Sequence, residues 1–174
     1  KITRDEAIDQ ISKNYQHFYN LFMSSKGGNI KVYIGADHRG FKLKEEIKTW
    51  LLENKISVED LGAFKYNPDD DYPLFAQEVA RNVSADLEKN LGVHGIVICG
   101  SGVGVDIVAN KFHHVRSGLA VSPKQIEEAR ADDDINVLAI PSDFTNEEDA
   151  KKIVKIFLET PFSKEEKKIR RLSE

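Results

Sequence analysis

Residues 95–104 read Gly-Ile-Val-Ile-Cys-Gly-Ser-Gly-Val-Gly, an uninterrupted apolar run that passes directly into a glycine-rich stretch. An apolar run without alternation is typical of a strand whose two faces are both covered, as in a parallel sheet. Residues 103–111, which follow, have the pattern of a helix. A buried strand joined to a helix through a tight glycine turn predicts an α/β domain.

Strands and helices alternate on both sides of this segment. We expect further strands over residues 30–36, 56–61, 115–121 and 137–140. We expect further helices over residues 42–53, 73–83, 124–131, 147–158 and 163–173. This alternation predicts a three-layer αβα domain of Rossmann-like type, with a five-stranded parallel sheet covered by helices on both faces.

Residues 1–29 form a separate unit in the pattern. A capping-box sequence at residues 3–6 precedes apolar residues spaced three and four apart, which predicts one amphipathic helix. Lys26-Gly27-Gly28-Asn29 is then expected to be a short linker. We therefore divide the chain into an N-terminal helical extension, residues 1–29, and a main domain, residues 30–174.

The composition argues against several classes of function. The 174-residue chain carries 25 Lys and Arg against 29 Asp and Glu, a net charge of −4, and this balance argues against a broad nucleic-acid surface. No apolar run approaches the ~20 residues of a membrane span. A single cysteine, Cys99, excludes an internal disulfide and a cysteine-rich zinc site and favours a reducing compartment such as the cytoplasm. The histidines show no metal-ligand spacing, so we expect no metal.

The residues that carry chemistry should follow strands, because ligands of open parallel sheets bind beyond the carboxyl ends of the strands. The turn at 99–104 offers several backbone N–H groups, with a helix dipole behind them, and its glycines permit close approach to an anion. A Cys at this place can act as a thiolate base or a nucleophile. The alternative is a buried Cys beside a structural turn. A phosphatase loop would carry Arg six positions after the Cys, but this chain has Val105 there. A dinucleotide-binding fingerprint would follow the first strand, whereas this turn follows the third. Neither motif matches well.

Two further segments are candidates for the same edge of the sheet. Asp37-His38 follows the first strand and could orient a hydroxyl group or transfer a proton, or be a solvated pair. Asp71-Tyr72-Pro73 could supply an aromatic wall and a hydroxyl group, or simply mark the start of a helix.

These segments together resemble a known family. The matching motifs are Asp37-His38-Arg39-Gly40-Phe41-Lys42-Leu43-Lys44, Asp71-Tyr72-Pro73, the 99–104 turn, Ala109-Asn110-Lys111, Val115-Arg116 and Asn136-Val137-Leu138, in this order. Residues 30–174 are similar to type B ribose-5-phosphate isomerases, in the family that also holds galactose-6-phosphate and allose-6-phosphate isomerases.

The resemblance implies a cofactor-free and metal-free aldose–ketose isomerase of carbohydrate metabolism that works through an enediol. Cys99 matches the base of the family, Asp37 matches a residue near the ring oxygen, and His38 matches a phosphate contact. Tyr72 matches the aromatic residue that lines the sugar, and Asn110 matches a further substrate contact. The enediolate would be held by Ser101 and by the backbone N–H groups of Gly100, Gly102, Val103 and Gly104.

The resemblance also implies a homodimer, and dimers that could pair into tetramers, with active sites between subunits. C-terminal cations reach the phosphate across the dimer in the family, and Lys167 and Arg171 occupy the matching positions here. The alternative for this tail is a solvated basic helix face.

Two positions depart from the family pattern. Asp132 stands where the family has a His that helps to open the sugar ring, and a carboxylate can serve as that base. The neighbouring Asp133 and Asp134 are expected to be solvated and to take no part in the reaction. Asp143 stands where the family has an Arg that contacts phosphate, which is unfavourable by charge. Three functions therefore stay open: a ribose-5-phosphate isomerase, an isomerase of a six-carbon phosphosugar such as allose or galactose 6-phosphate, and a catalytically impaired sugar-phosphate-binding subunit.

Overall fold

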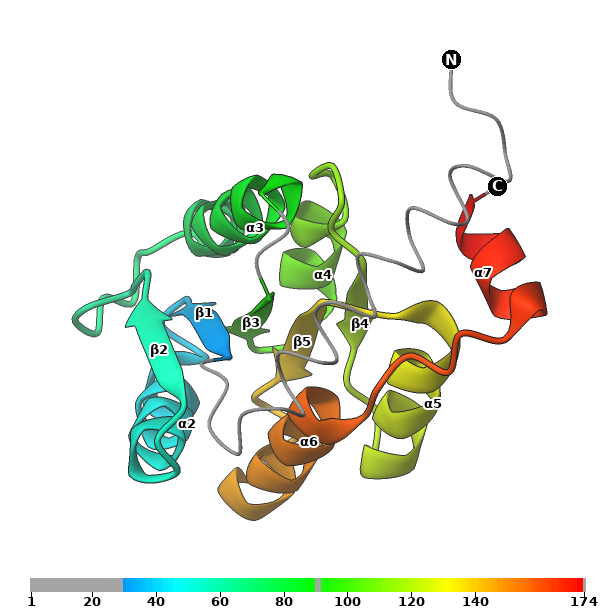
Figure 1. The fold of residues 1–174 in the computed structure, drawn as a ribbon. Helices are drawn as coiled ribbons and strands as arrows, with labels where there is room; N and C mark the ends of the chain where they lie inside the picture. The colour runs from blue at the N-terminus through cyan, green and yellow to red at the C-terminus, as the bar shows by residue number, and fades with distance from the viewer. Residues whose placement is uncertain (1–29, 90–91, 174) are drawn as a thin grey trace.

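The sheet has five parallel strands in the order β2-β1-β3-β5-β4 (Figure 1). A computed structural model describes residues 30–89 and 92–173; the helix expected within residues 1–29 lies outside the described residues. The strands are β1 Lys31–Ala36, β2 Ser57–Asp60, β3 Val93–Cys99, β4 Ser117–Leu119 and β5 Val137–Pro141. The expected α/β class and the five-stranded parallel sheet are confirmed.

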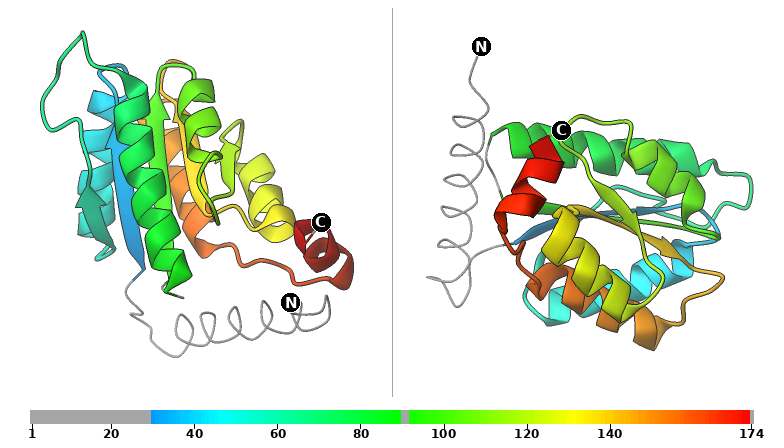
Figure 2. Two further views of the ribbon diagram at one scale, coloured as in Figure 1. Left: turned by 90° about the horizontal axis from the view of Figure 1, so that it is seen from above. Right: turned by 90° about the vertical axis from the view of Figure 1, so that its right-hand side faces the viewer.

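Helices cover both faces of the sheet, so the domain has three layers (Figure 1). The helices are α2 Phe41–Glu53, α3 Tyr72–Glu88, α4 Val103–Ala109, α5 Pro123–Asp133, α6 Glu147–Glu159 and α7 Glu166–Ser173. Helices α3 and α4 lie on one face, and α2, α5 and α6 lie on the other. Helix α7 lies at the margin, beside the end of α5 (Figures 1 and 2).

The core forms two apolar clusters, one beneath each helical layer. Every residue of β3 is buried, as expected for the central strand. One cluster joins β1, β3 and β5 to α2, α5 and α6, and includes Ile47 and Phe157. The other joins the same strands to α3 and α4, and includes Val79 and Val105. Burial on both faces is what produces the unbroken apolar runs in the sequence.

Helix α4 and strand β4 are among the elements that are shorter than the sequence predicts. Helix α4 ends at Ala109 rather than 111, and β4 spans 117–119 rather than 115–121. Side chains replace backbone partners at both boundaries. The Asn110 side chain accepts a hydrogen bond from Ser117 N at 2.9 Å and donates to its carbonyl at 3.1 Å, and Asn136 Oδ1 accepts from Arg116 N at 2.9 Å.

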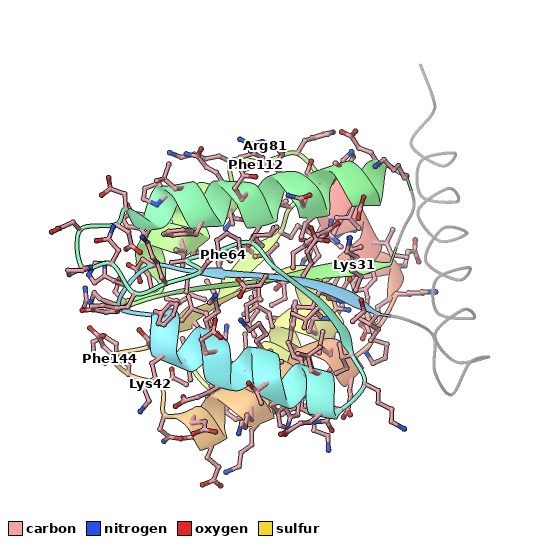
Figure 3. All side chains as sticks on the ribbon, turned by 90° about the vertical axis from the view of Figure 1, so that its left-hand side faces the viewer. Lys31, Lys42, Phe64, Arg81, Phe112 and Phe144 are labelled. Atoms are coloured by element: carbon pink, nitrogen blue, oxygen red, sulfur yellow. The ribbon has the colours of Figure 1, made fainter. Side chains whose placement is uncertain are left out.

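The turns that follow β1, β3 and β5 meet at one edge of the domain, because these strands are neighbours and run in parallel. Figure 3 shows this direction: Lys31, at the start of β1, lies at one end of the molecule, and Lys42 and Phe144 lie together at the other. We refer to the latter end as the carboxyl edge. The backbone of Asp143 donates to the Gly100 carbonyl at 3.0 Å, which joins the β5 turn to the β3 turn.

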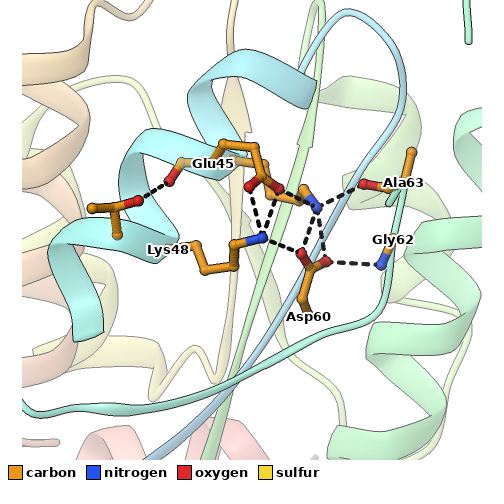
Figure 4. Close-up of polar contacts among 7 residues, drawn as sticks. Glu45, Lys48, Asp60, Gly62 and Ala63 are labelled. Atoms are coloured by element: carbon orange, nitrogen blue, oxygen red, sulfur yellow. Dashed lines mark hydrogen bonds and ion pairs between the residues drawn. The ribbon is translucent and has the colours of Figure 1, made fainter. Parts of the chain in front are cut away.

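A buried cation fixes the segment that leads from β2 to α3. Lys44 is 0% exposed, and its ammonium donates to both oxygens of Asp60, at 2.8 and 2.7 Å, and to the Ala63 carbonyl at 2.7 Å. Asp60 also accepts from Lys48 and from the Gly62 amide (Figure 4). This network holds the start of the segment that carries Asp70 and Tyr72 to the carboxyl edge.

Among residues 30–89 and 92–173, no helix is both long enough and apolar enough to span a membrane.

Candidate active site

Cys99 lies at the centre of the carboxyl edge. It is the last residue of β3 and is 4% exposed. Its side chain packs in the cluster beneath α3 and α4. Its carbonyl accepts hydrogen bonds from the Ser142 backbone N at 2.9 Å and from Ser142 Oγ at 3.1 Å. The end of β3 is therefore joined to the turn after β5 through Ser142.

The glycine turn after Cys99 has the conformation that its composition requires. Gly102 has φ = 72° and caps α4 without a side-chain hydrogen bond. A Cβ atom there would lie 2.5 Å from Leu119 and 3.0 Å from Pro141 N, so only glycine fits. The first N–H groups of a helix have no partner within it, so residues from 103 onward present donors beside Cys99. Ser101 is exposed at the same turn. The arrangement can stabilise an anion formed next to the thiol.

Tyr72 reaches this turn from the start of α3. A Cβ atom on Gly104 would lie 2.7 Å from the Tyr72 ring, so the ring rests on the first turn of α4. Tyr72 is 38% exposed, and one part of the ring is open to solvent. The structure therefore brings Tyr72 together with the Cys99 turn, as expected from the sequence.

Asp37 follows β1 and is 4% exposed. Its backbone N donates to the Ile98 carbonyl at 3.3 Å, one residue before Cys99, and its Oδ1 accepts from Gly40 N at 3.0 Å. Burial raises the pKa of Asp37 above its ordinary value, and the Gly40 hydrogen bond only partly opposes this. A carboxyl group that retains its proton more readily is suited to giving one to a sugar oxygen.

His38 forms a pair with Asp70 that the sequence did not indicate. Asp70 Oδ1 lies 2.8 Å from His38 Nδ1 and accepts from the His38 backbone N at 2.8 Å. The hydrogen bond to Asp70 raises the pKa of His38, and burial opposes the change. The second oxygen of Asp70 is buried and has no hydrogen-bond partner among residues 30–89 and 92–173. The pair fixes the ring of His38 and favours its protonated form, which suits an anion contact.

Arg39 and Asp143 form an ion pair across the carboxyl edge. Their side chains are 52% and 39% exposed. Asp143, one of the two positions that depart from the family pattern, thus lies beside a cation that comes from the β1 turn. A Cβ atom on Gly100 would collide with the Arg39 guanidinium, so the guanidinium lies directly against the Gly100 backbone. The sequence did not indicate that Arg39 would pair with Asp143.

The remaining site residues predicted from the sequence lie near the opposite, amino edge. Asp132 is near the end of α5, and α5 leads into the start of β5. Its Oδ1 pairs with Lys168 Nζ at 2.6 Å. Lys167 and Arg171 are exposed on α7, the same helix. Figure 2 shows α7 far from the β2–α3 segment. Within one chain, these residues are not brought together with Cys99.

Asn110 is also at the amino edge, at the end of α4. Its side chain is engaged with Ser117 and with the Asp106 carbonyl, to which it donates at 3.1 Å. The structure gives Asn110 a clear part in joining α4 to β4, and its expected contact with substrate stays a prediction.

The expectation that Asp134 is a solvated bystander is wrong. Asp134 accepts from Arg116 Nη2 at 2.6 Å and from Arg130 Nη1 at 2.8 Å. Arg130 is buried and also donates to the carbonyls of Ile135 and Thr160. Asp134 is therefore the counter-ion of a buried guanidinium, which needs one in an apolar environment.

No group of three or more His, Cys, Asp and Glu side chains in the described part of the chain is arranged to hold a metal ion. His94 is a core residue whose ring lies 5.1 Å from that of Phe157, edge to face. Burial lowers the pKa of His94 to about 3, with the charge of Arg130 adding to the effect, so the ring is neutral.

Comparison with known proteins identifies the family of the chain. The family model described as ribose/galactose isomerase matches residues 32–174. A Mycoplasma genitalium protein described as a probable ribose-5-phosphate isomerase B is 40% identical over 134 residues, 77% of this chain and 86% of the relative. Ribose-5-phosphate isomerase B of Escherichia coli is 39% identical over 128 residues, 74% of this chain and 83% of the relative.

The fold is shared with solved structures as well. The crystal structure of ribose-5-phosphate isomerase B from Mycoplasma genitalium, with bound ribulose-5-phosphate, superposes with a TM-score of 0.78 at 38% identity. The match covers 83% of this chain and 92% of that one. The fold is an α/β domain with a Cys-glycine turn at its carboxyl edge. The family model and the relatives show that the chain belongs to the ribose/galactose isomerases.

Proposed function

We propose that this protein interconverts ribose 5-phosphate and ribulose 5-phosphate, with Cys99 as the base. The observation that carries the proposal is the placement of Cys99 beside the Gly102 turn, with Asp37 and Tyr72 around it. A protein that only bound sugar phosphates would not need a thiol at the centre of the site. The relatives named above as ribose-5-phosphate isomerase B support the choice of substrate.

The reaction moves one proton between neighbouring carbons. The Cys99 thiolate takes the proton from C2 of the open-chain aldose, and the electron pair moves onto the C1 oxygen to give an enediolate. Backbone N–H groups of residues 100–104 and the Ser101 hydroxyl donate to that oxygen. The proton then returns to C1, and the proton of the C2 hydroxyl is transferred to the C1 oxygen, which leaves the ketose with a C2 carbonyl and a C1 hydroxyl. No metal or cofactor enters this balance.

The buried carboxyl group of Asp37 is proposed to assist in opening the sugar ring. Its raised pKa favours donation of a proton to the ring oxygen as the ring opens. The protonated His38 ring, held by Asp70, provides a charge for the phosphate end of the substrate. A thiolate base must stay reduced, so we place the activity in the cytoplasm.

We further propose that the protein works as a homodimer, with each site completed by the partner copy. Asp132, Lys167 and Arg171 lie toward the amino edge, roughly a strand length or ~15 Å from Cys99 in the same chain. A two-fold arrangement can bring the amino edge of one copy to the carboxyl edge of the other. Asp132 would then share in ring opening, and Lys167 and Arg171 would bind phosphate.

The test is a coupled assay for ribulose 5-phosphate formation without added metal, on the wild type and on Cys99→Ala. Removal of a general base costs about 10²–10⁴-fold in rate, so we expect kcat to fall by at least ~10²-fold while the denaturation midpoint stays unchanged. Retention of most of the rate by Cys99→Ala would show that another residue is the base. An inactive wild type that turns over galactose or allose 6-phosphate would assign the six-carbon reaction.

The same variant tests the shared site. Arg171→Ala is also expected to be impaired, and an equal mixture of the two variants, unfolded and refolded together, should recover about a quarter of the wild-type activity, because half of the dimers then hold one intact site. Recovery is absent if each chain builds its site alone.

A further inference from the structure

Arg39 occupies an unusual place for a surface cation. It belongs to the short turn between β1 and α2, whereas Asp143 belongs to the turn after β5. Strand β3 lies between β1 and β5, so the guanidinium crosses above the end of β3 to reach its partner. The guanidinium accordingly contacts Gly100, the residue after Cys99.

The backbone beneath the guanidinium is held rigidly. Ser142 Oγ is 3.1 Å from the Arg39 carbonyl and 3.1 Å from the Cys99 carbonyl, and it is a donor to either. Asp143 N donates to the Gly100 carbonyl at 3.0 Å. The three turns are thus joined through residues adjacent to the base, and a charge on Arg39 is presented at a fixed place next to the reacting end of β3.

Stability alone is a poor explanation for this arrangement. The side chains of the pair are about half exposed, and exposed ion pairs contribute little to folding. A glycine at position 100 is required for the guanidinium to lie where it does. The pair engages Nη2, and a guanidinium has five N–H donors arranged to meet planar oxyanions, so the same group can bind a second anion beside Asp143.

The side of the strand from which Arg39 comes indicates which end of the substrate it meets. Gly100, the first residue after β3, faces the Arg39 guanidinium, which a Cβ atom there would overlap. Cys99 packs on the α3 and α4 side. Arg39 comes from the turn that starts α2, on the other side. A substrate whose reacting carbons lie at Cys99 would direct its far end toward Arg39, and the far end of a sugar phosphate is the phosphate group.

We propose that Arg39 binds the phosphate group of the substrate from within the same chain as Cys99. Among residues 37–40, 100–102 and 142–146, Arg39 is the one permanently charged cation, and it pairs with the carboxylate of Asp143. A phosphate dianion that enters this region is repelled by Asp143, and the Arg39 guanidinium offsets that repulsion with a permanent positive charge. The inference rests on the proposed isomerase function, which it extends with a specificity-determining residue.

The test compares Arg39→Ala with Lys42→Ala, which removes the same charge at an exposed position in the first turn of α2, near the same end of the molecule (Figure 3). Steady-state kinetics with ribose 5-phosphate, and binding of inorganic phosphate measured by calorimetry, are recorded for both variants. A lost charge-assisted contact corresponds to about 10–100-fold. We expect Arg39→Ala to raise KM and the phosphate dissociation constant by this factor with kcat changed less than ~3-fold, and Lys42→Ala to change each less than ~3-fold.

Equal effects of the two substitutions would overturn the proposal, because they would reflect general electrostatics. A loss confined to kcat would also overturn it, since Arg39 would then act on the chemical step. If the wild type does not turn over ribose 5-phosphate, the proposed function fails by itself. The phosphate-binding comparison still decides whether Arg39 is the anion contact.

Discussion

Replacement of Lys44 by Met tests whether the buried cation network positions the β2–α3 segment. The substitution keeps an unbranched side chain of similar length, which can fill the same space, but removes the charge and the donors. The Lys44 ammonium makes two hydrogen bonds to Asp60 and one to the Ala63 carbonyl, and its side chain is fully buried. The carbonyl of Ala63 would lose this donor, and Asp60 would keep Lys48 and the Gly62 amide.

The expected loss follows from these contacts. A hydrogen bond to a charged group contributes about 1.5–3 kcal/mol, and a buried acceptor left without a partner costs about 1–3 kcal/mol. Because Asp60 is still paired, the total lies below the sum and near the lower end of the cost of breaking a buried ion pair, about 3 kcal/mol. For a domain of this size the midpoint of thermal unfolding should fall by about 6–12 °C.

Urea denaturation followed by circular dichroism measures the free energy of unfolding of the variant. Lys42→Met is the matched control, because the Lys42 side chain is 90% exposed and its ammonium lies 3.6 Å from Glu46; it should change stability by less than about 0.5 kcal/mol. A Lys44→Met protein within about 1 kcal/mol of the wild type would refute the reasoning. It would show that the network is replaceable by apolar packing, as happens for some buried ion pairs.

Two other predictions follow from the site. Gly102→Ala forces a Cβ into a position with φ = 72°, against Leu119 and the Pro141 backbone. The free energy of unfolding, measured by urea denaturation, should fall by about 1–3 kcal/mol, and most of the turnover should be lost. Wild-type kinetics in this variant would contradict the role of the turn. Asp70→Asn removes the hydrogen-bonded charge that raises the pKa of His38, so the His38 pKa measured by NMR titration should fall toward its ordinary value. Because that pKa is raised in the folded protein, the stability from the pair is fully present below about pH 6.5 and is lost as the pH rises through the folded value. An unchanged His38 titration in Asp70→Asn would disprove the pairing.

Much of the fold could be predicted from the sequence, because a parallel strand that is buried on both faces has a continuous apolar sequence. Apolar runs predict the strands at residues 95–99 and 137–140, and the glycine turn after Cys99 marks the start of α4. The class of site followed from one rule, that ligands of such sheets lie at the carboxyl ends of strands. The structure places Asp37, Tyr72 and Cys99 at that edge.

The pairings between turns could not be predicted, because they depend on the strand order. Arg39 and Asp143 are separated by 104 residues, and His38 and Asp70 by 32. Alternation of strands and helices does not fix the order in which the strands lie side by side. The burial of Lys44, by contrast, is indicated by the sequence. Position 44 lies on the same face of α2 as the core positions 47 and 51.

Cys99 is the single thiol of the printed sequence, and in the folded chain it is 4% exposed. A maleimide or iodoacetamide reagent therefore has one target, and it can react only when the end of β3 opens to the reagent. The rate of labelling then reports how often the centre of the site becomes accessible, without the engineered reporter cysteine that such experiments usually require. Protection by a bound sugar phosphate, read by mass spectrometry as a single added mass, gives an occupancy assay that needs no turnover.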